Sequence, residues 1–163
     1  MNRWHLLYTK PRQEERAFIN LMSQNYESYL PLISKEKISQ NKKVLIKEPM
    51  FPRYLFVRLS DDGYQNWSPI RSTKGVSHLV TFGSHLAILD DEIISNLRRE
   101  LNNDSVVKAF SEGDSIEIVN GPFKGLEAIF RSYSGEERAV LLLDFMAKHI
   151  SVKVDLGQFK KSA

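Results

Sequence analysis

One segment near the end of the chain, RAVLLLDFMAKHISVKV, fits two incompatible secondary structures. Residues 140–143 form a short apolar run and residues 150–154 alternate strictly, a pattern typical of half-buried strands. The same residues fit a helix with 3.6 residues per turn equally well. One side of that helix would carry Arg138, Leu141, Leu142, Phe145, His149 and Val152. Periodicity alone does not choose between the two, so the rest of the chain has to.

The segment just before it, GDSIEIVNGPFKGLEAIF, favours strands. It describes a strand, a glycine-rich turn and a second strand. Pro122 alone would cost a helix about 3 kcal/mol relative to alanine, and Gly121 and Gly125 are also poor helix residues. A unit of about 50 residues buries little core by itself. Two packings of this tail could therefore lie within a few kcal/mol of each other.

The first hundred residues predict a separate α+β sandwich with the order β-α-β-β-β-α. We expect strands at residues 3–10, 53–59 and 77–82, helices at 12–25 and 90–101, and a polar projecting hairpin or loop at 33–49 with QNKK as its turn. The first helix would have Phe18, Leu21, Met22 and Asn25 on its apolar stripe. The expected division is residues 1–101, a linker at 102–112, and a C-terminal unit at 113–163.

The charge distribution points to an anionic partner for the front of the chain. Residues 1–58 hold 11 lysines and arginines but five acids, whereas residues 101–163 hold eight against nine. Nucleic acid fits such a basic half, although a merely solvated basic surface fits it equally well. The chain has no cysteine and no apolar run near the roughly 20 residues that span a bilayer. We expect a cytoplasmic protein with no membrane association.

Nothing in the sequence indicates catalysis. The four histidines have no metal-ligand spacing, and the pairs at Asp61 and Asp90 suit a turn and a helix cap. There is no phosphate-binding glycine loop and no nucleophile elbow. We therefore expect no enzyme activity, no cofactor and no metal.

The strand RYLFVRL carries aromatic side chains on one of its two faces. Leu55, Val57 and Leu59 point to one face, and Tyr54 and Phe56 point to the other, where Tyr8 could join them. An exposed aromatic face beside basic residues is typical of a protein-docking site. A face covered by a helix would instead be ordinary core, and the pattern alone leaves both open.

Several stretches, in order, resemble the NusG family of transcription elongation factors. They are WHLLYTK, EPMFPRYLFV, TKGVSHLVTFG, the NGPFKG loop typical of a KOW domain, and RAVLLLDF. Across almost the whole chain they are more similar to the specialised RfaH-type branch. The resemblance implies a NusG-type N-terminal α/β sandwich and a small KOW-type C-terminal domain. That domain would be an α-helical hairpin when docked and a five-stranded β-barrel when released, and we expect the helical form in the free protein.

The resemblance also implies a function: an operon-specific elongation factor and antiterminator that suppresses pausing and termination. Its partners would be the clamp helices of the largest RNA polymerase subunit, non-template strand DNA, and the ribosome through a small-subunit protein, with the factor itself a monomer. The alternatives are a general NusG-like factor without autoinhibition, and an RNA- or ribosome-binding KOW module.

The implied site residues fall into three sets. Polymerase would bind Tyr8, Phe51, Tyr54 and Phe56. DNA would meet Lys10, Gln13, Arg16, Asn20, Gln24, Arg71, Thr73 and Lys74, where amides can read base edges and cations can hold phosphates. The two domains would meet through Glu48, Arg138, Phe130, Leu141, Leu142 and Phe145, with the first two as an ion pair.

Overall fold

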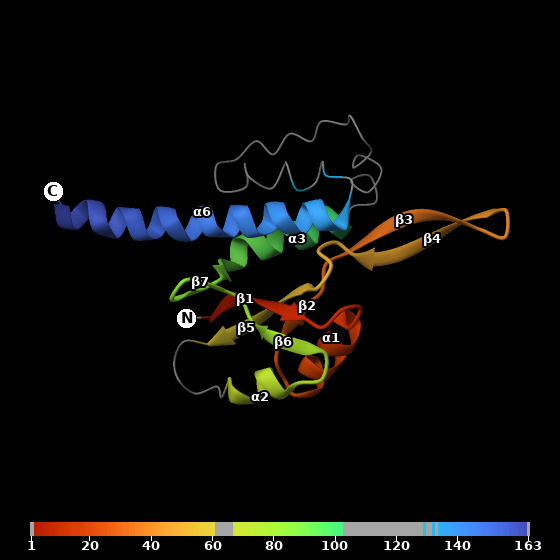
Figure 1. Ribbon diagram of the computed structural model, residues 1–163, viewed down its shortest axis with the longest axis horizontal. Helices are drawn as coiled ribbons and strands as arrows, with labels where there is room; N and C mark the ends of the chain where they lie inside the picture. Colours follow the sequence, from red (N-terminus) through yellow and green to blue (C-terminus); the bar gives the residue numbers. More distant parts are fainter. Residues whose placement is uncertain (1, 61–66, 103–128, 130–131, 133, 163) are drawn as a thin grey trace.

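The computed structural model describes residues 2–60, 67–102, 129, 132 and 134–162, with side chains of the last helix described up to residue 148 (Figure 1). Its centre is a five-stranded sheet in the order β2-β5-β1-β6, with β9 also pairing with β1. The strands are β1 (Asn2–Thr9), β2 (Ser28–Tyr29), β5 (Tyr54–Ser60), β6 (Val76–Leu79) and β9 (Ile88–Leu89). This mixed arrangement of strands and helices agrees with the predicted α+β class.

The antiparallel register of β1 and β5 sorts the side chains of the sheet onto two faces. Leu7 pairs with Leu55, and both belong to a buried cluster with Ala17 and Leu21 of α1 (Glu14–Ser23). On the other face, Leu6 pairs with Phe56 in a second buried cluster. The two cores therefore follow the strand alternation read from the sequence.

Helix α1 is shorter than predicted and its buried stripe is different. The prediction of residues 12–25 fails at both ends, because Arg12 and Asn25 have positive φ values of 61° and 66°. Asn25 donates from its backbone N–H to the carbonyl of Met22, and Tyr26 donates to that of Leu21. This pair of bonds is a Schellman motif, which ends the helix. The buried residues are Glu14, Ala17 and Leu21, whereas Met22 is 46% exposed.

Helix α3 (Asp91–Asn102) is attached to the sheet through its first residue. The indole N–H of Trp4 donates to Asp91 Oδ1 at 2.6 Å, and Arg58 Nη2 donates to Oδ2 at 2.6 Å. Near the other end of the helix, the Arg98 guanidinium lies 5.0 Å from the ring centre of Trp4. An acid in the first turn also suits the helix dipole. These contacts hold α3 across the face that carries Phe56.

The polar segment after β2 forms a projecting hairpin, as predicted. Its strands are β3 (Leu32–Ser39) and β4 (Lys42–Pro49), paired only with each other among the described residues. The turn residues Gln40 and Asn41 have φ values of 51° and 63°. Two positive values are the geometry of a type I′ turn, the common two-residue connection of a twisted hairpin.

Two short elements after β5 depart from the prediction. The expected strand at 77–82 divides into β6 and β7 (Thr81–Phe82), because β7 turns away to pair with β8 (His85–Leu86). A one-turn helix, α2 (Ser68–Ser72), was not predicted. Its signal was Pro69 in the first turn, where proline's fixed φ suits a helix start.

The ambiguous segment is helical in this structure. Helix α6 (Gly135–Ser162) includes all of it (Figure 1), and its Leu142 lies in the same buried cluster as Ile93 and Leu97 of α3. Of the predicted hairpin at 113–130, only Ile129 is described: it is helical instead of extended, and it is buried in the same cluster as Leu142. All but the first residue of the 102–112 linker lie outside the described residues. No helix in the described part of the chain is long and apolar enough to cross a membrane.

Two glycines with positive φ allow a matched test of how β6 is held. A Cβ on Gly75 (φ 96°) would lie 2.7 Å from the Ala17 backbone nitrogen, while one on Gly83 (φ 63°) would meet nothing within 4 Å. We expect Gly83→Ala to lower the free energy of unfolding by about 1 kcal/mol, the conformational cost alone. Gly75→Ala should cost more, since α1 must also move. Urea unfolding measures both, and equal losses would contradict this account.

Candidate functional site

The aromatic residues expected to bind polymerase lie together on one face of the sheet. The rings of Tyr8 and Tyr54 are 5.1 Å apart, and those of Phe51 and Phe56 are 6.3 Å apart and edge-on. Phe51 and Phe56 are fully buried, whereas Tyr8 and Tyr54 are half-buried. In this structure the face is therefore divided into a closed phenylalanine core and an accessible tyrosine edge.

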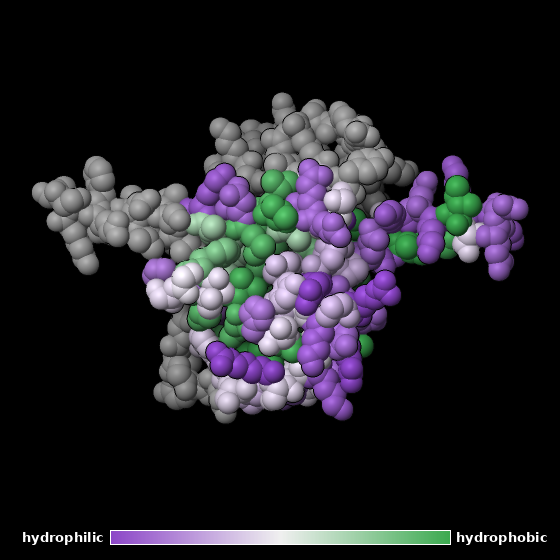
Figure 2. Space-filling view, viewed as in Figure 1, coloured by the Kyte–Doolittle hydropathy of each residue, from purple (hydrophilic) through white to green (hydrophobic). Residues whose placement is uncertain are grey.

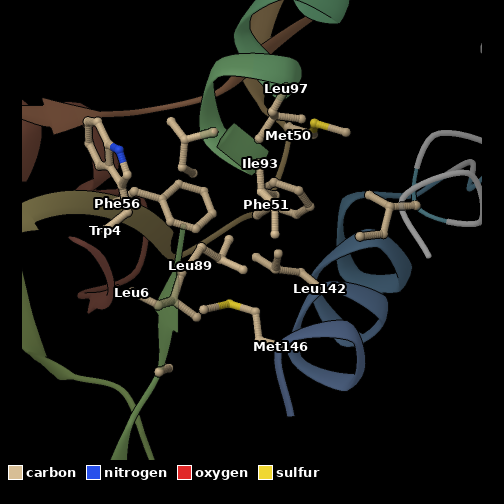
Figure 3. Close-up of a cluster of buried hydrophobic side chains, with 13 residues drawn as sticks. Trp4, Leu6, Met50, Phe51, Phe56, Leu89, Ile93, Leu97, Leu142 and Met146 are labelled. Carbon is tan, nitrogen blue, oxygen red and sulfur yellow. The ribbon is translucent and has the colours of Figure 1, made fainter. Parts of the chain in front are cut away.

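Helix α6 provides much of the cover over the phenylalanines. Leu142 and Met146 point from it toward Phe51, Leu89 and Leu6 (Figure 3), and both side chains are buried. The predicted Leu141 and Phe145 are half-buried against the same cluster, and Phe130 lies outside the described residues. Figure 2 shows apolar atoms gathered across the middle of this view of the molecule. Burying one such side chain fully contributes about 1.5–3 kcal/mol.

The sequence analysis missed Met146 and Ala139, both buried on α6. The apolar stripe predicted for this helix followed steps of three and four residues from Arg138. It did not include Met146, which lies four residues after Leu142. An i, i+4 step from Leu142 gives Met146 directly. The start of α6 had a signal as well: Ser134 and Glu137 form the S-x-x-E spacing of a capping box. The Glu137 N–H indeed donates to Ser134 Oγ at 3.1 Å.

Arg138 is buried at the edge of this face, with only 5% of its surface exposed. Its Nε donates to the Met50 carbonyl at 2.8 Å and its Nη1 to the Ser132 carbonyl at 3.1 Å. Nη2 lies 4.0 Å from Glu48 Oε1, so the expected pair is within ion-pair distance but long. Burial lowers the pKa of Arg138, and the Glu48 carboxylate partly opposes that shift.

The first turn of α6 also packs closely against the turn that precedes β5. A Cβ on Gly135 would lie 2.6 Å from Pro52 Cγ, so only glycine fits there without movement. In that turn the Arg53 φ is 72°, and its N–H donates to the buried carboxylate of Glu14. The Arg53 guanidinium lies 4.1 Å from the ring centre of Tyr8.

The tyrosine edge is electrostatically unlike the exposed surface. Burial raises the pKa of Tyr54, and the neighbouring Tyr8 adds to the shift while Arg53 opposes it. Burial also raises the pKa of Tyr29, which stacks beside Phe56, to about 12. Tyrosines are ordinarily neutral at physiological pH, and these shifts leave both phenols as neutral hydrogen-bond donors, which suits an amphipathic docking surface.

The residues expected to face DNA form a second surface, where α1 meets the loop between α2 and β6. Asn20 Nδ2 donates to the Lys74 carbonyl at 3.4 Å, and Gln24 Nε2 donates to Thr73 Oγ1 at 2.9 Å. The Lys10 N–H donates to the Gly75 carbonyl. These bonds and those of Gln13 to the Lys10 carbonyl and of Asn20 to the Arg16 carbonyl connect seven of the eight expected residues, all except Arg71, which lies in α2. The seven are Lys10, Gln13, Arg16, Asn20, Gln24, Thr73 and Lys74.

Members of this surface differ in what they offer a ligand. Thr73 is buried, and its hydroxyl donates to the Pro69 carbonyl while accepting from Gln24, so it positions the loop. Lys10, Arg16, Arg71 and Lys74 are exposed. Asn20 also donates to the Arg16 carbonyl within α1. The exposed cations are therefore the groups available for phosphates. Within the described residues, no group of three or more His, Cys, Asp or Glu side chains could hold a metal ion.

Met146 provides a test of whether α6 is docked in solution. Met146→Ala should lower the free energy of unfolding by about 2–5 kcal/mol, since it leaves a cavity in the packed cluster. Val140→Ala, on the same helix but 64% exposed, is the matched control and should change stability by less than about 0.5 kcal/mol. Amide exchange of α6 should rise only in the first variant. Equal exchange in both would mean that α6 is not held by this contact.

Comparison with known proteins identifies the fold family. The family model for "Transcription termination factor nusG" matches residues 2–98. The "Transcription termination/antitermination protein NusG" of Thermus thermophilus is 26% identical over 98% of this chain and 98% of its own length. The protein of the same name from Streptomyces coelicolor is 24% identical over 98% of this chain and 63% of its own length.

A solved structure, described as "Domain interaction in Thermotoga maritima NusG", is also similar. It has 22% sequence identity and a TM-score of 0.44, and the match covers 76% of this chain and 75% of that one. The family model itself covers more than half of the chain and includes both surfaces described above up to residue 98. This chain therefore belongs to the NusG family of transcription termination and antitermination factors.

Proposed function

We propose that this protein is a specialised, autoinhibited antiterminator of the RfaH type. Its N-terminal domain, residues 1–101, would bind the clamp helices of the largest RNA polymerase subunit through the aromatic face. Binding across the polymerase cleft would suppress pausing and termination. A linker at 102–112 would join it to a C-terminal domain at 113–163. The protein would act as a cytoplasmic monomer, with no catalytic activity and no cofactor.

The observation that carries this proposal is the position of α6 over the aromatic face. Leu142 and Met146 occupy the space against Phe51 that a polymerase helix would need. A general NusG-like factor would leave that face open. The ligand site and the inhibitory helix therefore compete for one apolar surface, and binding requires that α6 leave.

The release of α6 supports a second activity for the C-terminal domain. The segment at residues 113–130 favours strands by composition, and α6 loses its apolar partners once it is undocked. We propose that the released domain refolds as a five-stranded KOW barrel, which would then bind the ribosome through a small-subunit protein.

Recruitment to chosen operons would use the surface between α1 and the loop after α2. Exposed Lys10, Arg16, Arg71 and Lys74 would hold the phosphates of a non-template DNA strand. Gln13, Asn20 and Gln24 carry the amides that can read base edges. The hydrogen bonds of Asn20 and Gln24 to the neighbouring loop fix their position before DNA arrives.

The Arg138 site gives a test of autoinhibition. Arg138→Ala removes three contacts of a buried cation, whereas Glu48→Ser removes one partner at 4.0 Å. We expect both to raise the released population, with Glu48→Ser shifting it by up to about tenfold and Arg138→Ala by more. NMR secondary shifts of the full chain measure the loss of helix, and transcription on a template without a recruiting element measures activity.

Two further variants complete this test. Exchanging the charges, with Glu48→Arg and Arg138→Glu together, should restore closure only in part, because a carboxylate cannot donate to the carbonyls of Met50 and Ser132. Asp144→Ser is the control, since it removes only an exposed pair with Lys148 on the same helix. Autoinhibition is contradicted if Glu48→Ser and Arg138→Ala each keep every helical shift and neither gains element-independent activity. Barrel shifts in the wild-type chain would favour the general NusG-like factor.

The DNA surface is tested by removing its cations one at a time. Arg16→Ala should weaken binding to an elongation complex that displays the recruiting element. Lys10→Ala should reduce the salt slope by about 0.7, the value of one phosphate contact to a single strand. Ile19→Ala changes an exposed apolar residue of the same helix and should leave both quantities unchanged. Wild-type loading by both charge variants would mean that DNA binds elsewhere.

A further inference from the structure

The β3–β4 hairpin is a basic ribbon that takes no part in either core cluster beyond its base. Residues 32–49 carry five lysines and two glutamates, a surplus of positive charge equal to that of the whole chain. Four of the lysines, Lys37, Lys42, Lys43 and Lys47, are exposed and have no acidic partner among the described residues. Charge of one sign is thus concentrated on one projecting element (Figure 1).

The hairpin also exposes the most accessible large apolar side chains in the described part of the molecule. Ile38 is 74% exposed and Leu45 is 70% exposed. The register pairs Ile38 with Lys43, Glu36 with Leu45 and Ser34 with Lys47, so these residues share one face of the ribbon. Lys37 and Lys42 lie on the opposite face. Figure 2 shows apolar atoms among hydrophilic ones along this projection. Apolar groups flanked by unpaired cations are unusual for a surface that meets only water.

We infer that this hairpin is a second nucleic-acid contact, which lies in a groove of duplex DNA and holds it without regard to sequence. The lysines would neutralise phosphates, and Ile38 and Leu45 would contact the sugars that line the groove. This site is separate from the α1 surface, and it does not depend on the proposed polymerase role.

The geometry favours duplex DNA over other partners. The major groove of B-form DNA is about 12 Å wide and admits a two-stranded β-ribbon. Strands of eight residues extend about 25 Å, enough to follow that groove. The major groove of an A-form RNA helix is too deep and narrow for side chains to read. A second protein strand could pair with the open edges, but lysines along an edge discourage such pairing.

The test uses the full chain and a mixed-sequence DNA duplex of about 30 base pairs, followed by fluorescence anisotropy from about 50 to 200 mM salt. The double variant Lys43→Gln and Lys47→Gln, on the face that carries Ile38 and Leu45, should reduce the slope of log affinity against log salt by about 1.8, since each phosphate contact adds about 0.9. Lys43→Gln alone should reduce it by about 0.9, and the matched control Lys148→Gln on α6 should leave it unchanged.

Three further measurements make the result specific to the hairpin and to DNA. Ile38→Ser with Leu45→Ser should weaken binding without changing the salt slope. The lysine effect should persist in a chain that also carries Lys10→Ala and Arg16→Ala. An RNA duplex of the same sequence should bind more weakly. The inference is overturned by an unchanged slope in the double lysine variant or by an equal loss from Lys148→Gln. Equal or tighter RNA binding, or a dimer in sedimentation that Ile38→Ser with Leu45→Ser abolishes, would also overturn it.

Discussion

The need to cover one apolar face of a thin sheet organises this molecule. The side chains of β1 and β5 point alternately to the two faces of the sheet, and apolar residues of both strands lie on each face. Helix α1 covers one face within the N-terminal unit. The other face carries Trp4, Leu6 and Phe56, and α3 alone does not complete its cover. Helix α6 supplies Leu142 and Met146 to the same cluster, so the N-terminal fold and the state of the C-terminal segment are coupled through one surface.

Polar contacts at the rim define the position of that cover more than they stabilise it. Arg138 is held by two carbonyls and by a long ion pair with Glu48, and it has lost most of its hydration. A buried cation with incomplete compensation is a poor source of net stability but a strong selector of geometry. The contact of Gly135 with Pro52 acts in the same way, because a larger residue than glycine would meet the proline ring and displace the helix end. Such contacts can fix one docked position of α6 and still allow the helix to leave the sheet.

Much of the N-terminal unit could be predicted from pattern. The alternation of β5, the projecting hairpin with its turn in QNKK, and the acidic start of α3 all follow from local rules. Errors arose where local chemistry is weak or depends on neighbours. The end of α1 depends on Asn25 adopting a left-handed conformation, and the break between β6 and β7 depends on pairing with β8. The buried state of Phe56 could not be read at all, since alternation gives a face and says nothing of what covers it.

Helix α6 has some features that its own sequence determines and others that depend on residues far away in the chain. The sequence by itself determined that residues 138–154 are compatible with a helix and with strands, and it provided a capping box at Ser134 to begin a helix. It also determined which side chains share a side, which is why Leu141, Leu142 and Phe145 were found. Only the tertiary structure decided for the helix, because Leu142 and Met146 are buried when Phe51 and Leu6 lie opposite them. Those partners are about ninety residues or more away in the chain, and no local pattern contains them.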